Sequence, residues 1–215
     1  MLTVKIDISG SGYSPALEQE IRENLSKYYE VYARGCKAPA AGPEILVQLT
    51  IEGLSRIGEI VAEELPGVII GGAAAEVVSR VRSAFIRWRS KSSIENRDSS
   101  ASSDFAPEYL AEVRLILPSY DLVIWSIPDE GTDVDQYDLN ELVQRVEEFV
   151  RSENEENSLV SRVVLPCEVV AEGNRKSLVE GHGNPNLWHV FYRDGERWPS
   201  AVYDADDRCF LSDLY

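Results

Sequence analysis

The sequence has few of the residues that metal, redox and nucleophilic sites need. Its 215 residues include three cysteines and two histidines, and the cysteines form no CxxC pair. Basic residues are also scarce: 21 Lys and Arg stand against 37 Asp and Glu, which gives a formal net charge of −16. This charge disfavours nucleic acid and anionic membranes as partners, because both are bound through Lys and Arg. It suits a highly soluble protein, or one whose partner is basic.

Long apolar runs are missing as well. The longest uncharged apolar stretch runs from Leu65 to Ala75, whereas a spanning helix needs roughly 20 apolar residues. The opening residues, MLTVKIDIS, alternate and lack the apolar centre of a secretory signal. Widely spaced cysteines without an evident pairing are typical of a reducing compartment. We therefore expect a cytoplasmic protein with no membrane insertion.

Hydrophobic periodicity predicts an α+β fold. Alternating apolar residues predict strands at 2–8, 45–51, 113–117 and 122–127. Stripes at helical spacing predict helices at 17–32, 54–65, 70–88 and 139–150. Start signals support two of these helices, namely Ser14-Pro15 and the D-x-x-E pattern at Asp138. The order β-α-β-α-α-β-β-α indicates an α/β domain over residues 1–151.

The remaining segments differ in character from this domain. Residues 90–108 contain seven serines and few apolar groups, which predicts a flexible loop. Residues 158–215 predict a small antiparallel β-meander unit, with turns at Gly173-Asn174 and in the Asp-rich stretch that follows Tyr203. Gly71 and Gly72 fit no phosphate-binding pattern, so we expect them to permit close helix packing.

Three segments within residues 2–151 follow one another in a distinctive order: IIGGAAAEVVSRVRSAFIRWRSK, AEVRLILPSYDLVIWSI and DLNELVQRVEEFVRS. This layout resembles the effector-associated constant components of bacterial conflict systems. The resemblance implies an adaptor or immunity-like role beside an effector. It carries over no catalytic residues.

Two histidines and one aspartate are the candidates for chemistry. His182 lies in the loop sequence GHGNPN, where it would act as an acid–base group with His189 and Asp204 nearby. The simpler interpretation is a loop histidine, a strand histidine and a turn aspartate. A zinc site normally has closely spaced ligand pairs, and an EF-hand loop needs Gly and Glu where Cys209 and Tyr215 stand. We therefore predict no metal and no cofactor.

Aromatic and arginine side chains are the candidates for partner binding, because Trp, Tyr and Arg dominate binding hot spots. They belong to the C-terminal unit and to the basic end of the helix at 70–88. The predicted partner-binding residues are Trp188, Tyr192, Trp198, Tyr203, Trp88, Arg87 and Arg89. The basic helix end has two other interpretations: cations that complement a helix C-terminus, and a salt-sensitive contact with nucleic acid.

The strand around His189 is aromatic on both faces. Alternation places Trp188, Val190 and Tyr192 on one face, and His189 and Phe191 on the other. An acidic flank runs from Asp129 to Glu156. Taken together, these features favour a non-catalytic protein–protein interaction module, an accessory or immunity-like component of a conflict system. The alternative is a small enzyme or ligand-binding domain around His182, His189 and Asp204.

Overall fold

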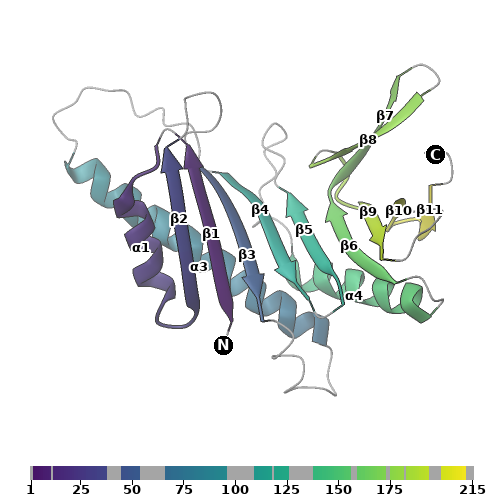
Figure 1. The fold of residues 1–215 in the computed structure, drawn as a ribbon, viewed down its shortest axis with the longest axis horizontal. Helices are drawn as coiled ribbons and strands as arrows, with labels where there is room; N and C mark the ends of the chain where they lie inside the picture. The colour runs from purple at the N-terminus through teal and green to yellow at the C-terminus, as the bar shows by residue number, and fades with distance from the viewer. Residues whose placement is uncertain are drawn as a thin grey trace.

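The computed structural model describes most of the chain (Figure 1). The described residues are 2–10, 12–37, 45–53, 66–95, 109–117, 119–125, 138–155, 159–172, 175–181, 183–193 and 200–211. The first strands are β1 (Thr3–Gly10), β2 (Glu30–Lys37), β3 (Leu46–Glu52), β4 (Tyr109–Ile116) and β5 (Asp121–Trp125). The helices are α1 (Pro15–Leu25), α3 (Pro66–Glu95) and α4 (Leu139–Glu155). The later strands are β6 (Val160–Leu165), β7 (Cys167–Glu172), β8 (Arg175–Glu180), β9 (Leu187–Tyr192), β10 (Ser200–Asp204) and β11 (Cys209–Phe210).

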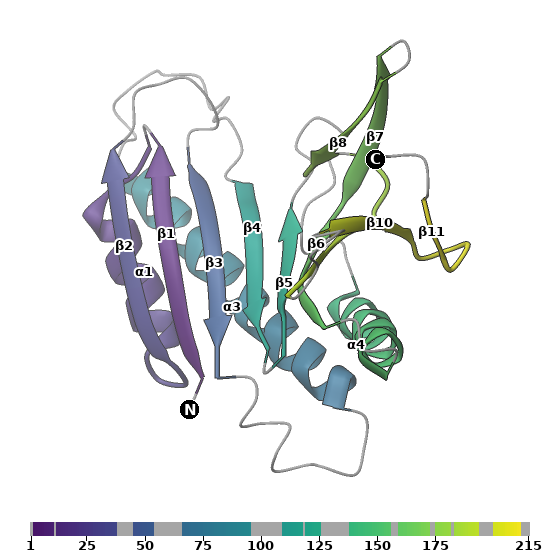
Figure 2. The ribbon, with the colours of Figure 1, turned by 45° about the vertical axis from the view of Figure 1, so that its right-hand side comes forward.

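The strands build one mixed sheet and one hairpin. The nine-stranded sheet has the order β11-β10-β9-β6-β5-β4-β3-β1-β2, and β7 pairs with β8. The pairs β1–β2, β3–β4 and β5–β6 are parallel. Figures 1 and 2 show α1 and α3 on one face of β2, β1, β3 and β4, and in the part of the chain that the structure describes no helix covers the opposite face. The expected α+β class is confirmed.

The prediction of a helix through residue 32 is wrong. Helix α1 starts as expected, with the Ser14 hydroxyl accepting from the Leu17 N–H at 3.3 Å, but it ends at Leu25. Tyr32 belongs instead to β2, which pairs with β1 along its whole length. Aromatic and β-branched residues such as Tyr32 and Val31 favour strands, and the parallel partner decides between the two local possibilities. The element order therefore starts β-α-β-β.

The serine-rich segment predicted as a loop at 90–108 starts as a helix. Helix α3 continues to Glu95, so the prediction is wrong for residues 90–95, while residues 96–108 lie outside the described part. The Ser90 hydroxyl donates to the Ile86 carbonyl at 2.9 Å. Such a bond to the preceding turn lets serine remain in a helix. The helix predicted at 54–65 also lies outside the described residues.

The sheet does not stop at the boundary expected between 151 and 158. Strand β6 pairs in parallel with β5, from Asp121 opposite Arg162 to Ile124 opposite Leu165. The antiparallel pairs β6–β9, β9–β10, β10–β11 and β7–β8 continue the chain beyond it. Separate folding of residues 1–151 and 158–215 stays a prediction. Both segments contribute strands to one sheet.

Helix α4 follows its sequence signals closely. The Asp138 carboxylate accepts from the N–H groups of Asn140 at 3.0 Å and Glu141 at 3.1 Å, which caps the helix start. The expected apolar face is buried: Leu139, Leu142, Val143, Val146, Phe149 and Val150. Gly71 of α3 packs on this helix start, because a Cβ on Gly71 would lie 2.5 Å from the Leu139 carbonyl oxygen. The close-packing prediction is confirmed at Gly71.

Candidate functional site

A cleft of about 480 Å³ lies between α4 and the turn that joins β10 to β11. We call it the aromatic cleft. Its lining consists of Arg145, Glu148, Phe149, Ser152, Trp188, Tyr203, Ala205, Asp206 and Arg208. Two of the predicted partner-binding residues, Trp188 and Tyr203, therefore come together here, although 14 positions separate them in the chain.

Three aromatic rings from three elements form the floor of the aromatic cleft. Phe149 of α4 meets the Trp188 ring edge-on at 5.7 Å and the Tyr203 ring at 4.3 Å, measured between centroids. Trp188 is 1% exposed, and its indole N–H donates to the Pro185 carbonyl at 3.2 Å. Phe210 of β11 extends the cluster at 5.2 Å from Tyr203 and is 41% exposed. The three floor rings are thus packed against one another, while the neighbouring Phe210 ring is accessible.

Arg145 lines the cleft, and three polar groups hold its guanidinium in place. Its guanidinium donates to the Asn186 side-chain oxygen at 3.1 Å and to the Ala205 carbonyl at 3.3 Å. An Asp206 carboxylate oxygen lies 3.6 Å away. The guanidinium also lies 5.8 Å from the Trp188 ring centroid, a cation–π distance. These contacts fix the position of the charge, which reduces the entropy that binding would cost.

Arg208 also lines the aromatic cleft, in the turn that joins β10 to β11. Its φ of 52° places a non-glycine residue in the left-handed region, which is uncommon. The turn is held by the Asp204 carboxylate, which accepts from the N–H groups of Asp206 at 3.0 Å and Asp207 at 3.2 Å. Burial raises the pKa of Tyr203, and the positive charge of Arg208 acts against that rise. The turn therefore presents an exposed guanidinium beside the aromatic floor.

Other predicted partner-binding residues lie elsewhere. Tyr192 is half-buried and donates to a Glu153 carboxylate oxygen at 3.1 Å, and burial raises the pKa of its hydroxyl. Trp198 and His182 lie outside the described residues. Two residues of the expected acidic flank therefore make contacts within the chain. Glu153 accepts from Tyr192, and Glu147 accepts from the Tyr120 hydroxyl at 3.1 Å.

The basic end of α3 faces α1. Arg87 lies 3.8 Å from a Glu20 carboxylate oxygen, and Lys91 pairs with the same carboxylate. Trp88 packs partly buried against the core, and Arg89 lies in the same helix. Because α3 continues to Glu95, its last turn contains no basic residue, so Arg87 and Lys91 do not complement the helix C-terminus. Both cations instead join α3 to α1 through Glu20.

The residues proposed for chemistry do not form one group among the described contacts. His189 Nδ1 lies 2.6 Å from a Glu180 carboxylate oxygen, and its ring packs on Phe191 at 4.1 Å between centroids. Asp204 uses its carboxylate in the turn described above. Cys167 is buried, and burial raises the pKa of its thiol to about 12. A thiol that stays protonated at neutral pH is a poor nucleophile.

Sequence reasoning missed four residues of this region: Arg145, Phe149, Arg208 and Phe210. Phe149 belongs to the predicted apolar face of α4, so periodicity identifies it as a core residue but not as the floor of a cleft. Phe210 and Arg208 follow an Asp-rich turn, which is a signal for a turn alone. Only the contact between α4 and the C-terminal strands brings the four together.

Within the described ranges, no group of three or more His, Cys, Asp or Glu side chains is placed to hold a metal ion. None of the described helices has the length and apolar character that crossing a bilayer requires. Comparisons of the chain with protein-family models, with curated proteins and with solved structures found no match.

Proposed function

We propose that this protein is a protein–protein interaction module whose partner inserts an apolar side chain into the aromatic cleft. The observation that carries the proposal is the composition of the cleft, which has a packed aromatic floor and two arginines in its lining. The accessible Phe210 ring packs beside this floor against Tyr203. Trp, Tyr and Arg are the residue types most enriched at binding hot spots. A volume of about 480 Å³ lies within the range of small-molecule pockets, so the cleft has room for a side chain.

The charge of the chain indicates the character of the partner. A formal net charge of −16 accelerates encounter with a basic surface. At the cleft itself, the carboxylates of Glu148 and Asp206 stand beside two arginines, so the net charge of the chain carries this argument. We therefore propose a basic partner that presents an apolar anchor. The accessory or immunity-like role implied by the conflict-system resemblance is compatible with such binding and belongs to the same proposal.

The test is capture of a partner followed by measurement with variants. Tagged protein is incubated with lysate of the source organism, and stoichiometric partners are identified by mass spectrometry. The purified partner is then titrated against Phe210→Ala and against Ile86→Ala, a control that removes an exposed apolar side chain from α3. We expect Phe210→Ala to weaken binding at least about tenfold and Ile86→Ala to leave it unchanged. Equal affinities, or no stoichiometric partner, would reject the proposal.

A second candidate function rests on the contact between His189 and Glu180. A carboxylate that contacts one ring nitrogen orients an imidazole for acid–base work. In this alternative the protein is a small enzyme or ligand-binding domain, with His182 and Asp204 as further members. His182→Ala separates the two candidates: lost ligand binding with an intact fold supports the second, whereas an unchanged partner complex supports the first.

A further inference from the structure

Strand β2 is the long free edge of the nine-stranded sheet. It is the end strand and pairs only with β1 among the described strands, whereas the strand at the opposite end, β11, has two residues. The Glu30 N–H donates to the Leu2 carbonyl at 3.0 Å, so Glu30 and every second residue after it direct their backbone groups toward β1. Val31, Ala33 and Gly35 consequently direct theirs outward. Such an edge is a template for strand addition.

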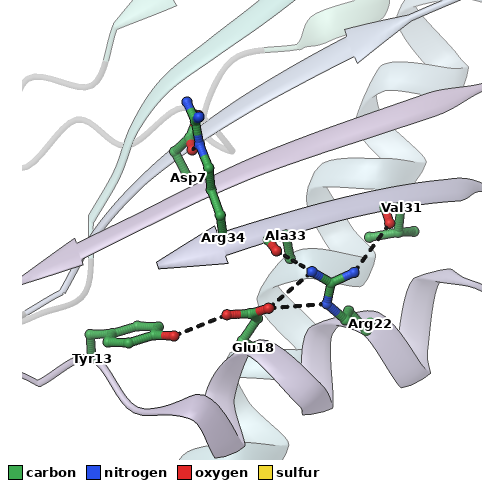
Figure 3. A network of polar contacts seen from close by, with 7 residues as sticks. All are labelled: Asp7, Tyr13, Glu18, Arg22, Val31, Ala33 and Arg34. Carbon is green, nitrogen blue, oxygen red and sulfur yellow. Dashed lines mark hydrogen bonds and ion pairs between the residues drawn. The ribbon is translucent and has the colours of Figure 1, made fainter. Parts of the chain in front are cut away.

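The side chain of Arg22 covers the outward carbonyls. It reaches from α1 across the edge and donates to the Val31 carbonyl at 3.5 Å and, through Nη2, to the Ala33 carbonyl (Figure 3). These are the two successive outward carbonyls at the start of β2. A strand adding to this edge would have to displace the guanidinium, because its own N–H groups need the same acceptors.

The guanidinium is itself held in position by a chain of contacts. Arg22 donates to one Glu18 oxygen through Nε at 3.1 Å and through Nη2 at 2.9 Å. The other Glu18 oxygen accepts from the Tyr13 hydroxyl at 2.9 Å, and this bond raises the pKa of Tyr13 above its ordinary value. Figure 3 shows the three side chains in line along the edge.

Gly35 makes room for the Tyr13 ring. A Cβ on Gly35 would lie 1.9 Å from a carbon of that ring, so any side chain here would expel the tyrosine. The glycine, the tyrosine, the glutamate and the arginine thus act together on one edge. From this arrangement we infer that Tyr13, Glu18 and Arg22 form an edge cap, which prevents β2 from pairing with β2 of a second copy of this chain.

A second copy is the relevant occupant because every copy carries the same edge. Two β2 strands related by a two-fold axis would pair antiparallel and self-complementary, the geometry of an isologous dimer. The formal charge of −16 on each copy opposes this approach at low salt, and salt screens the repulsion. The edge cap therefore matters most at high ionic strength.

The experiment compares Arg22→Ala with Arg80→Ala. Arg80 forms an i,i+4 pair with Glu76 at 2.6 Å on α3, so it matches the Arg22–Glu18 pair without reaching the β2 edge. Association is measured by sedimentation velocity over a range of concentrations in high salt. We expect at least about tenfold tighter self-association for Arg22→Ala than for the wild type or Arg80→Ala. A folded, monomeric Arg22→Ala variant would overturn the inference, as would equal association of Arg80→Ala.

A double variant separates strand pairing from general unfolding. The Val31 N–H points outward, so Val31→Pro removes no bond to β1 but blocks an added strand. We expect Arg22→Ala/Val31→Pro to return to the monomer. Persistent association of the double variant would show that exposed core, and not the β2 edge, is responsible. If Arg22→Ala does not fold, Glu18→Ala, which removes the acceptor of the guanidinium and leaves Arg22 in place, is expected to give a smaller shift in the same direction. The absence of this shift would overturn the inference.

Discussion

The two halves of the sheet share a helix-covered face but differ on the opposite one. In the half formed by β2, β1, β3 and β4, the opposite face is polar, as shown by the Lys5–Glu52 ion pair at 2.5 Å between adjacent strands. In the half formed by β5, β6, β9 and β10, the corresponding positions are apolar and buried: Val123, Val164 and Val202. Both halves have the same alternation. The difference lies in what covers the second face.

The end of the β7–β8 hairpin contacts this face. Glu180 of β8 contacts His189, and a Cβ on the next residue, Gly181, would lie 3.5 Å from the Trp125 ring. Where the chain returns over the sheet, apolar side chains are buried on both faces. Where it does not, the outer face is solvated and its charges pair across strands. Four predictions test this contrast.

The largest effect is expected on the helix-covered face of β9. Trp188→Ala removes a side chain that is 1% exposed and contacts Phe149 and Tyr203, so it should lower the free energy of unfolding by about 3–5 kcal/mol. His189→Ala, on the other face of the same strand, should cost less than about 1.5 kcal/mol. Urea unfolding of both variants measures the difference. Equal losses in the free energy of unfolding would show that the face of β9 toward the β7–β8 hairpin contributes as much stability as the face toward α4.

The next effect concerns α3, which contacts both α1 and α4 and so links the two halves. Gly71→Ala places a methyl group 2.5 Å from the Leu139 carbonyl oxygen, and the resulting displacement should cost about 1–3 kcal/mol. Gly72→Ala meets only the Asn140 side-chain oxygen at 3.3 Å, and should be neutral or stabilise the helix by up to about 1 kcal/mol. Thermal and urea unfolding test the pair, and a larger loss at Gly72 would contradict the close-approach argument.

The third prediction concerns the pH dependence of stability that the buried thiol of Cys167, at the start of β7, should cause. Its folded-state pKa, raised by burial to about 12, lies above the ordinary value of 9.0. The stability it contributes is therefore complete below pH 9 and is lost as the pH rises toward 12. Between pH 8 and 10.5 the wild type should lose on the order of 1–2 kcal/mol more than Cys167→Ala. Urea titrations at both pH values supply the comparison, and parallel losses would mean that the thiol is solvated.

The smallest effect is expected on the polar face. Lys5→Ala breaks a partly exposed ion pair with Glu52, and such pairs contribute roughly 0.2–1 kcal/mol. The loss should shrink further in high salt, because the two charges are accessible to ions. Urea unfolding at low and high salt measures it. A loss comparable to that of Trp188→Ala would mean that this face is buried against something else.

Much of the fold is readable from local pattern, and little of the site is. The cap at Asp138, the apolar face of α4 and the start of α1 at Ser14 depend on neighbours within a few residues, so they are predictable. The aromatic cleft depends on α4, β9 and the β10–β11 turn, which meet only in the folded chain. Local spacing carries no information about that meeting.

By itself the sequence determined which residues are apolar, where helices can start and which positions alternate. It left open whether Val31 and Tyr32 continue a helix or begin a strand, and the parallel pairing with β1 decided this. It also placed His189 and Trp188 on opposite faces without saying what covers either. The tertiary structure decided that, because burial depends on contacts between segments that are distant in the chain, and periodicity records only the residues along it.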